Sequence, residues 1–375
     1  MKILRIILSL VGLLVLLCII VIAGIVFFVD PNKLKPVIIE EVKKESGYQL
    51  TIEGPLSWAL YPRLGVHIDK LTLTAPNQTA AFVECSNINM ATSLTDLLTG
   101  QEKLEGSVRI GILRLYQLAA ENTYVDVRWH NKVLTLEPLQ ATFYGGTLSG
   151  KIEATHLSAK PQWNMNLQLN QVQLKPLLKD LNGDHAKVNL SAISDVKWVV
   201  TTTGMTRDEW INNLNGAMTL KLTNGAIEGI DFNYLVTAAN DLIHARMVEM
   251  PPATQITYFH NLSGSFIIKN GVMETNNLLL ESPSFTSKAE GNLNLLAQRI
   301  DYHLQIQPLQ EDTIHWAVPV LVTGEWQDPS VNLDKVALEK MAVEEQLQKV
   351  KSKVQTEVKK LPEEANKLIQ KLINP

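Results

Sequence analysis

Cysteine is nearly absent from this sequence: its 375 residues include only Cys18 and Cys85. Cys18 lies inside an apolar N-terminal segment, so Cys85 has no partner for a disulfide. An excess of charge of one sign is also missing. The formal net charge is −4, whereas a nucleic-acid-binding protein needs a basic surface. A disulfide-stapled fold and a general nucleic-acid binder are therefore excluded, and a reducing compartment or a bacterial periplasm fits.

Motifs for catalysis and metal binding are missing as well. None of the eight histidines lies at metal-ligand spacing from another His or a Cys, and no hydrolase elbow Gly-x-Ser-x-Gly occurs. Residues 145–151 have the glycine and lysine spacing of a phosphate-binding loop. However, Ile152 replaces the required Ser or Thr, and the next residues alternate as in a strand. We expect a hairpin turn there, and no enzyme, cofactor or metal site.

The longest apolar run covers residues 6–29, which are 24 residues without a charge. As a helix it would be roughly 36 Å long, enough to cross a hydrocarbon core of about 30 Å. The alternative is a cleaved signal peptide, whose apolar core is usually about 7–15 residues long. We expect an uncleaved anchor after a cytoplasmic tail, 1–5. The lysines that follow the run favour the opposite orientation, but a long downstream domain translocates largely regardless of such charges.

Beyond residue 47, apolar and polar residues alternate with a period of two. The clearest segments are 71–74, 125–129, 163–170, 218–222 and 302–306. Asn224-Gly225 and Asn270-Gly271 are strong hairpin signals. The pattern predicts a mainly β chain of roughly 20 antiparallel strands, each with one apolar face to cover. Because helices are too few to cover these faces, we expect a long curled sheet that is either an open groove or sandwich-like.

Helices are expected at a few places. Residues 30–47 fit a short amphipathic helix, with Asp30 as its cap and Gly47 at its end. Residues 93–100, the segment after the capping box of Thr206 and Glu209, and 232–247 are also predicted to be helical. The tail 335–375 carries nine Lys and six Glu, and Pro362 breaks or kinks it. Its helical stripe predicts a helix that is either solvated or bound to a partner or membrane surface; the stripe consists of Val343, Leu347, Val350, Val354 and Leu361.

Short motifs along the chain carry a family resemblance. They lie at 30–36 (DPNKLKP), 46–50, 52–58, 62–65, 144–150, 214–232, 262–272 and 323–329. These segments resemble the AsmA family of Gram-negative envelope proteins. The resemblance implies an inner-membrane anchor and a periplasmic domain similar to chorein-type bridge-like lipid transfer proteins, whose curled sheet forms an apolar groove. It also implies a role in phospholipid transport and outer-membrane integrity, without enzymatic activity.

The expected organisation follows from these observations. After the tail 1–5 and the transmembrane helix 6–29 come an N-terminal AsmA-like β region, 30–200, a C-terminal one, 201–334, and the helical tail 335–375. The expected function is the handling or transfer of phospholipid through an apolar β-groove by an inner-membrane-anchored periplasmic protein that supports outer-membrane biogenesis. The alternative is a non-catalytic envelope assembly factor or regulator with a closed β-sandwich core.

Groove-lining residues are expected on the three best-alternating strands. The candidates are Trp163, Met165, Leu167, Leu169, Met218, Leu220, Leu222, Tyr302, Leu304 and Ile306. The expected partners are membrane phospholipid, the inner membrane through residues 6–29, and an envelope protein through the C-terminal tail.

Overall fold

The computed structural model describes residues 30–358 except 47, 60–63, 76–77, 93–103, 157–159, 184–185, 205 and 310–315. Several expectations fall outside these residues: the tail 1–5, the anchor 6–29, the helix 93–100, the cap at Gly47 and the kink at Pro362. Within the described part of the chain, no helix combines the length and the hydropathy that crossing a membrane requires.

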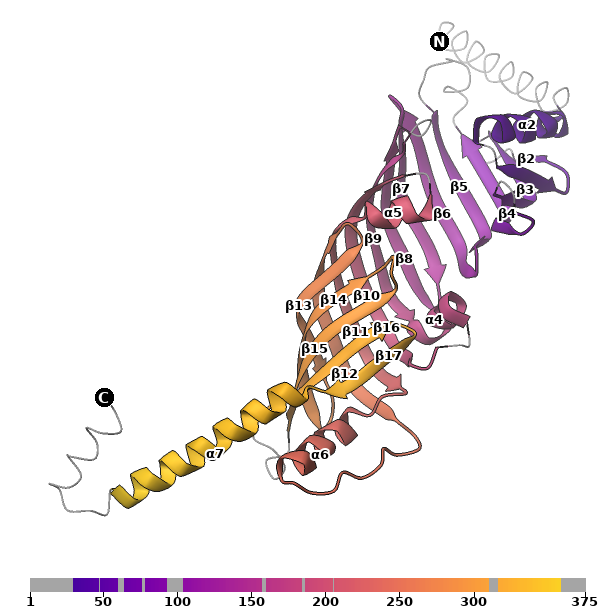
Figure 1. Cartoon of the computed structure of the whole chain (residues 1–375). Coiled ribbons are helices and arrows are strands. Elements are labelled where there is room, and N and C mark those ends of the chain that lie inside the picture. Colours follow the sequence, from indigo (N-terminus) through magenta and orange to yellow (C-terminus); the bar gives the residue numbers. More distant parts are fainter. Residues whose placement is uncertain are drawn as a thin grey trace, which may run out of the picture. The chain divides into compact units, whose positions relative to one another are not determined.

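The described chain is mainly β, as the alternation predicts (Figure 1). All its strands belong to one 17-stranded antiparallel sheet and not to two separate sheets. The strands are β1 (Gln49–Glu53), β2 (Ser57–Ala59), β3 (Leu64–Thr74), β4 (Ala81–Thr92), β5 (Leu104–Leu115), β6 (Leu118–His130), β7 (Val133–Phe143), β8 (Gly146–Thr155), β9 (Gln162–Gln173), β10 (Asn189–Thr203), β11 (Asn215–Glu228), β12 (Ile256–Lys269), β13 (Val272–Glu281), β14 (Phe285–Asn294), β15 (Arg299–Pro308), β16 (Val318–Glu325) and β17 (Asp328–Leu333).

Few helices accompany the sheet in the described residues. They are η1 (Pro31–Lys33), α2 (Leu34–Ser46), α4 (Leu174–Asn182), α5 (Arg207–Asn212), α6 (Phe232–Ile243) and α7 (Lys335–Val358). The helix predicted for 30–47 is confirmed, and Asp30 accepts a hydrogen bond from the backbone N–H of Asn32. The predicted cap of α5 is also confirmed, since the hydroxyl of Thr206 accepts the backbone N–H of Glu209.

The chain forms two compact units. Unit 1 comprises the described residues within Met1–Asp184, Ala192–Lys221 and Phe266–Gly271; unit 2 comprises those within His185–Ser191, Leu222–Ser265 and Val272–Pro375. In unit 1, β3 to β9 pair in chain order, β10 pairs with β9, and β1 and β2 both pair with β3. In unit 2, β13 to β17 also pair in chain order.

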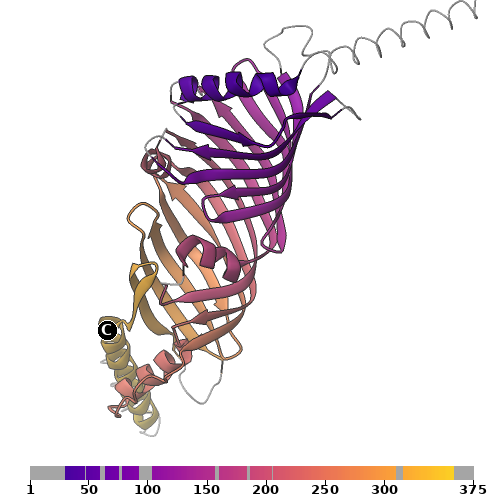
Figure 2. The ribbon, with the colours of Figure 1, turned by 90° about the vertical axis from the view of Figure 1, so that its right-hand side faces the viewer.

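The first helix covers the beginning of the sheet in unit 1. Ile39 and Val42 of α2 pack against a buried cluster on β1, β3 and β4 and the turn after β1. Figure 2 shows α2 alongside these first strands. The cluster consists of Leu50, Ile52, Leu56, Ile68, Cys85 and Ile88. Burial raises the pKa of the Cys85 thiol, so this cysteine is a core residue and not a reactive one.

Two sequence predictions need correction, and one helix was not predicted. Asn224-Gly225 is not a hairpin turn, because both residues lie inside β11; Asn270-Gly271 does form a turn, between β12 and β13. The helix predicted for 232–247 ends at Ile243, where α6 ends. The sequence reasoning missed α4 altogether, a nine-residue helix that buries Leu174 and Leu177.

Candidate functional site

The strand register of unit 1 separates apolar from polar side chains. Residues paired directly across neighbouring strands point to the same face of the sheet. One set of such residues, called the apolar row here, crosses β2 to β10 without a polar member. The apolar row consists of Trp58, Val66, Met90, Val108, Val125, Leu139, Gly150, Leu167 and Trp198.

On each strand, a residue directly beside the apolar-row member belongs to a second row, whose members are polar. This polar row also crosses β2 to β10, and every member is polar. It consists of Ser57, His67, Asn89, Arg109, Tyr124, Gln140, Ser149, Gln168 and Lys197. Because successive residues of a strand point to opposite faces, the sheet has one apolar face and one polar face along these rows.

The four candidates on β9 all point to the apolar face. Leu167 is a member of the apolar row, and the others continue apolar sets on each side of it. Trp163 pairs with Ala154, Met165 with Ile152, and Leu169 with Leu148, all on β8. Leu167 and Leu169 are buried, whereas the two residues nearer the start of β9 are half-buried. The predicted common face of this strand is therefore confirmed.

Most of the apolar row is only partly shielded from solvent. Among its members, Val66, Val108, Leu139 and Trp198 are half-buried. Met90 keeps 44% of its surface exposed. A packed core of two layers would bury such side chains completely. The apolar face of unit 1 is thus covered by α2 at its first strands and only partly covered over β4 to β10.

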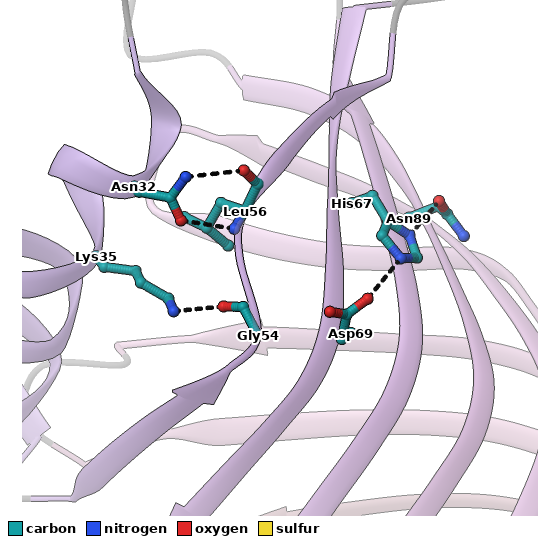
Figure 3. A network of polar contacts seen from close by, with 7 residues as sticks. All are labelled: Asn32, Lys35, Gly54, Leu56, His67, Asp69 and Asn89. Carbon is teal, nitrogen blue, oxygen red and sulfur yellow. Dashed lines mark hydrogen bonds and ion pairs between the residues drawn. The ribbon is translucent and has the colours of Figure 1, made fainter.

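Polar contacts fix the covering helix to the sheet (Figure 3). The side chain of Asn32 donates to the carbonyl oxygen of Leu56 at 3.2 Å and accepts its backbone N–H at 2.8 Å. Lys35 donates to the carbonyl oxygen of Gly54. Gly54 has a φ of 74°, which favours glycine, and a Cβ there would lie 2.2 Å from a carboxylate oxygen of Asp69, which would have to move.

Unit 2 contains an apolar pocket at the predicted β15 residues. The pocket has a volume of about 170 Å³ and is lined by Tyr302 and Leu304 together with Phe232, Leu278 and Ser287, among others. Burial raises the pKa of Tyr302 to about 12, which keeps its phenol neutral. The Ser287 hydroxyl is buried without a hydrogen-bond partner in the described structure. The pocket therefore offers apolar walls and very few polar atoms.

The remaining candidates are distributed between the units. Ile306 on β15 is fully buried and pairs with Val318. On β11, Met218 and Leu220 are half-buried in unit 1, and Leu222 is buried in unit 2. The structure thus groups the β9 residues on one face in unit 1 and brings two β15 residues to one pocket in unit 2.

Several residues of the apolar row and of the unit 2 pocket were not predicted from the sequence. Val66, Met90, Val108 and Val125 belong to the apolar row. Alternation in 64–74 and 104–115 carried the signal for Val66 and Val108, and alternation in 125–129 carried it for Val125. Phe232 was placed in a helix but not at the pocket. Its position directly after the helix cap Asp231 turns it toward Phe285, with the rings edge to face at 6.1 Å.

The phosphate-loop resemblance at 145–151 has a structural explanation. Tyr144 and Gly145 adopt positive φ in the turn between β7 and β8, as the hairpin prediction requires. Gly150 lies within β8, where a Cβ would come 2.2 Å from the carbonyl oxygen of Asn166 on β9. Lys151 forms ion pairs with two carboxylates, Glu153 at 3.0 Å and Glu137 at 3.3 Å, which raise its pKa. Its ammonium group is thus engaged by the sheet itself.

Comparison with known proteins places the chain in a family. The model of the AsmA family matches residues 1–115 and 102–278. The chain belongs to the AsmA family. Protein AsmA of Escherichia coli (strain K12) is 32% identical over 91 residues, which are 24% of this chain and 15% of that relative. This AsmA-family chain therefore spans a small part of the length of that relative, and no solved structure matches it.

No metal site accompanies these features in the part of the chain that the structure describes. There, no group of three or more His, Cys, Asp or Glu residues is placed to hold a metal ion. The family membership and the two-faced sheet are compatible with a role in the cell envelope.

Proposed function

We propose that this protein handles or transfers phospholipid in the envelope of a Gram-negative bacterium, along the apolar face of its sheet. The single observation that carries the proposal is the apolar row, which continues over nine strands without a polar side chain. An acyl chain needs such an uninterrupted lining, since each methylene exposed to water costs about 0.8 kcal/mol.

The partial burial of the row supports a lipid as its occupant. The half-buried side chains of Val108 and Leu139 leave apolar surface that an acyl chain would cover. The apolar pocket of unit 2, with Tyr302 and Leu304 on its wall, offers a second surface of the same kind. Neither feature contains the paired acid and base that a catalytic site would need, and a lipid carrier requires no catalytic residue.

The proposed location is the inner membrane, with the bulk of the chain in the periplasm. Residues 6–29 supply the anchor in this proposal, and the protein supports outer-membrane biogenesis and integrity. The alternative, a non-catalytic assembly factor with a closed sandwich core, requires that the apolar face be filled by the protein itself. Met90, which lies on that face and is 44% exposed, favours lipid handling.

Site-specific photo-crosslinking in cells tests the proposal. A photoreactive amino acid placed at Met90 or Leu167 should capture phospholipid, because both positions lie in the apolar row. Val199 is the matched control: it lies beside Trp198 on β10, pairs with Asn166 on the opposite face and is 50% exposed. Capture of lipid at Val199 alone, or at none of the three positions, would contradict the proposal.

Charge substitutions provide the functional readout. Met90→Asp should leave a folded protein, because Met90 is 44% exposed. Leu167 is buried, but the apolar face around it is only partly covered, so Leu167→Asp should also fold with its carboxylate reaching water. Both variants should fail to complement an envelope-permeability defect. Val199→Asp should complement. Circular dichroism and protease resistance report the fold, and detergent sensitivity reports the function. Degradation of both apolar-face variants would favour the sandwich core.

A further inference from the structure

Helix α7 carries an apolar stripe that the described structure leaves exposed. Only its beginning is packed: Leu338 is buried, and α7 contacts β16 and α6. Farther along, four apolar side chains are between 42% and 58% exposed: Val343, Leu347, Val350 and Val354. Figure 1 shows α7 extending away from the strands of its own unit. Exposure of such a stripe to water is unfavourable, and a partner that covers the stripe would remove this cost.

The spacing of the stripe identifies the kind of partner. Steps of four, three and four residues place these side chains at the two core positions of a heptad repeat, which gives a narrow seam. A helix that lies on a membrane or packs on a globular core presents a wider apolar face. The seam of α7 therefore fits one partner helix of the same kind.

The same spacing is compatible with an antiparallel pair of two copies. Steps of four, three and four residues read the same from both ends of the seam. In an antiparallel pair related by a two-fold axis, Val343 of one copy meets Val354 of the other, and Leu347 meets Val350. A symmetric dimer requires this self-complementarity, because both copies use the same surface.

The charges beside the seam also favour the antiparallel pair. The residues that flank a seam on its two sides form ion pairs between helices and set their orientation. In the antiparallel pair, Glu344 of each copy lies beside Lys351 of the other, and both side chains are exposed. A parallel pair would instead bring Glu339 of one copy against Glu344 of the other, which is a repulsive contact between like charges.

We infer that α7 is a self-association element, which joins two copies of this chain through an antiparallel helix pair centred between Leu347 and Val350. The inference does not depend on the proposed lipid function, because it uses only the seam and its charges.

Disulfide cross-linking of the full-length protein in membranes tests the inference. Cys18 and Cys85 are first replaced by Ser and Ala. Two differently tagged copies are then co-expressed, one with Val343→Cys and the other with Val354→Cys. The antiparallel pair places these two positions side by side, so the mixed disulfide should form. Each variant expressed alone should not cross-link, since its two copies of the cysteine are roughly 16 Å apart along the helix axis.

Control variants make the outcome specific. Thr356→Cys, an exposed position off the seam, should not cross-link to Val343→Cys. Glu344→Lys or Lys351→Glu alone should lower the yield of the mixed disulfide at least about threefold, and the two changes together in every copy should restore it. This rescue distinguishes the ion pair from a general effect of the substitutions on the helix.

Other outcomes overturn the inference. Self-cross-linking of Val343→Cys would show a parallel pair. Absence of any cross-link, with a monomeric mass by sedimentation in detergent, would show that the seam does not join copies of this chain. Binding of that monomer to phosphatidylglycerol vesicles, lost on Leu347→Asp, would assign the seam to a membrane surface.

Discussion

At the scale of single residues, Asn32 joins the first helix to the first strands. Its side chain makes both hydrogen bonds to the backbone of Leu56, one as donor and one as acceptor. Asn32 lies in the segment 30–36 that carries the family resemblance, and its role is structural. The backbone N–H of this residue also lowers the pKa of Asp30, the cap of the helix.

Asn32→Ala should loosen α2 without unfolding the sheet. The change leaves the N–H and carbonyl of Leu56 without their partner in a half-buried site, which should cost about 1–3 kcal/mol. Hydrogen exchange should show faster exchange in α2 and β1 and unchanged exchange in β13 to β15. Lys33→Ala, an exposed position on the same turn, is the control. Equal exchange in both variants would rule out the role assigned to Asn32.

Tyr144 makes a second residue-scale contact, between the β7–β8 turn and α4. Its hydroxyl donates to Asp180 on α4 at 2.5 Å and accepts the backbone N–H of Ala119 on β6. Burial, followed by the contact with Asp180, raises the pKa of Tyr144 to about 12 from 10.0. The folded state therefore holds the phenolic proton more tightly than the unfolded state does.

This shift predicts a loss of stability at high pH. The contribution of Tyr144 is fully present below pH 10 and is lost as the pH rises through about 12, because the unfolded chain releases the proton first. Denaturant unfolding between these pH values should show a declining free energy of unfolding. The decline should be shallower in Tyr144→Phe, and in Tyr302→Phe for the same reason. A profile identical to the parent in both variants would contradict the assignment.

At the scale of elements, β11 shows why a strong local signal failed. Asn224-Gly225 is a preferred pair for a two-residue hairpin, and Asn224 does adopt a positive φ of 51°. The strand nevertheless continues to Glu228. The glycine is needed there for space: a Cβ on Gly225 would lie 2.1 Å from the ring of Phe259 on β12. Glycine at position 225 is therefore explained by the nearby ring of Phe259 and not by a turn.

Gly225→Ala should therefore destabilise unit 2 by overpacking. Inserting one methyl group against a buried ring costs about 1–3 kcal/mol. Chemical denaturation should show the loss, and the double variant Gly225→Ala, Phe259→Leu should recover part of it because the smaller side chain makes room. If the single variant is as stable as the parent, the close contact with Phe259 does not constrain β11.

At the scale of the whole molecule, the proposed anchor and topology can be tested together. The full-length protein should remain in the membrane after carbonate extraction, and a protein lacking residues 1–29 should be released, because those residues contain the 24-residue apolar run. Alkaline phosphatase fused after Pro375 should be active, as expected for a periplasmic location. A mature N-terminus near Gly24 would show a cleaved signal peptide, and an inactive fusion would reverse the orientation.

Local alternation in the sequence identified several strands and their faces. In 163–170, four apolar residues alternate with four amides, and a strand is the conformation that places them on opposite faces. Short sequence motifs were also sufficient to indicate the family resemblance. The ends of elements were less certain: α6 ends at Ile243 and not at Met247, and Ala245 just beyond it has a positive φ of 52°.

Only the tertiary structure decided how the apolar faces join. The apolar row exists because nine strands pair in one register, and a slip of one residue would turn a strand's side chains to the other face. Register shifts lie directly beside the row, between Val125 and Val127 and between Leu136 and Leu139. Such irregularities depend on neighbouring strands, so the alternation within one strand could assign its faces but not the continuous surface that they form together.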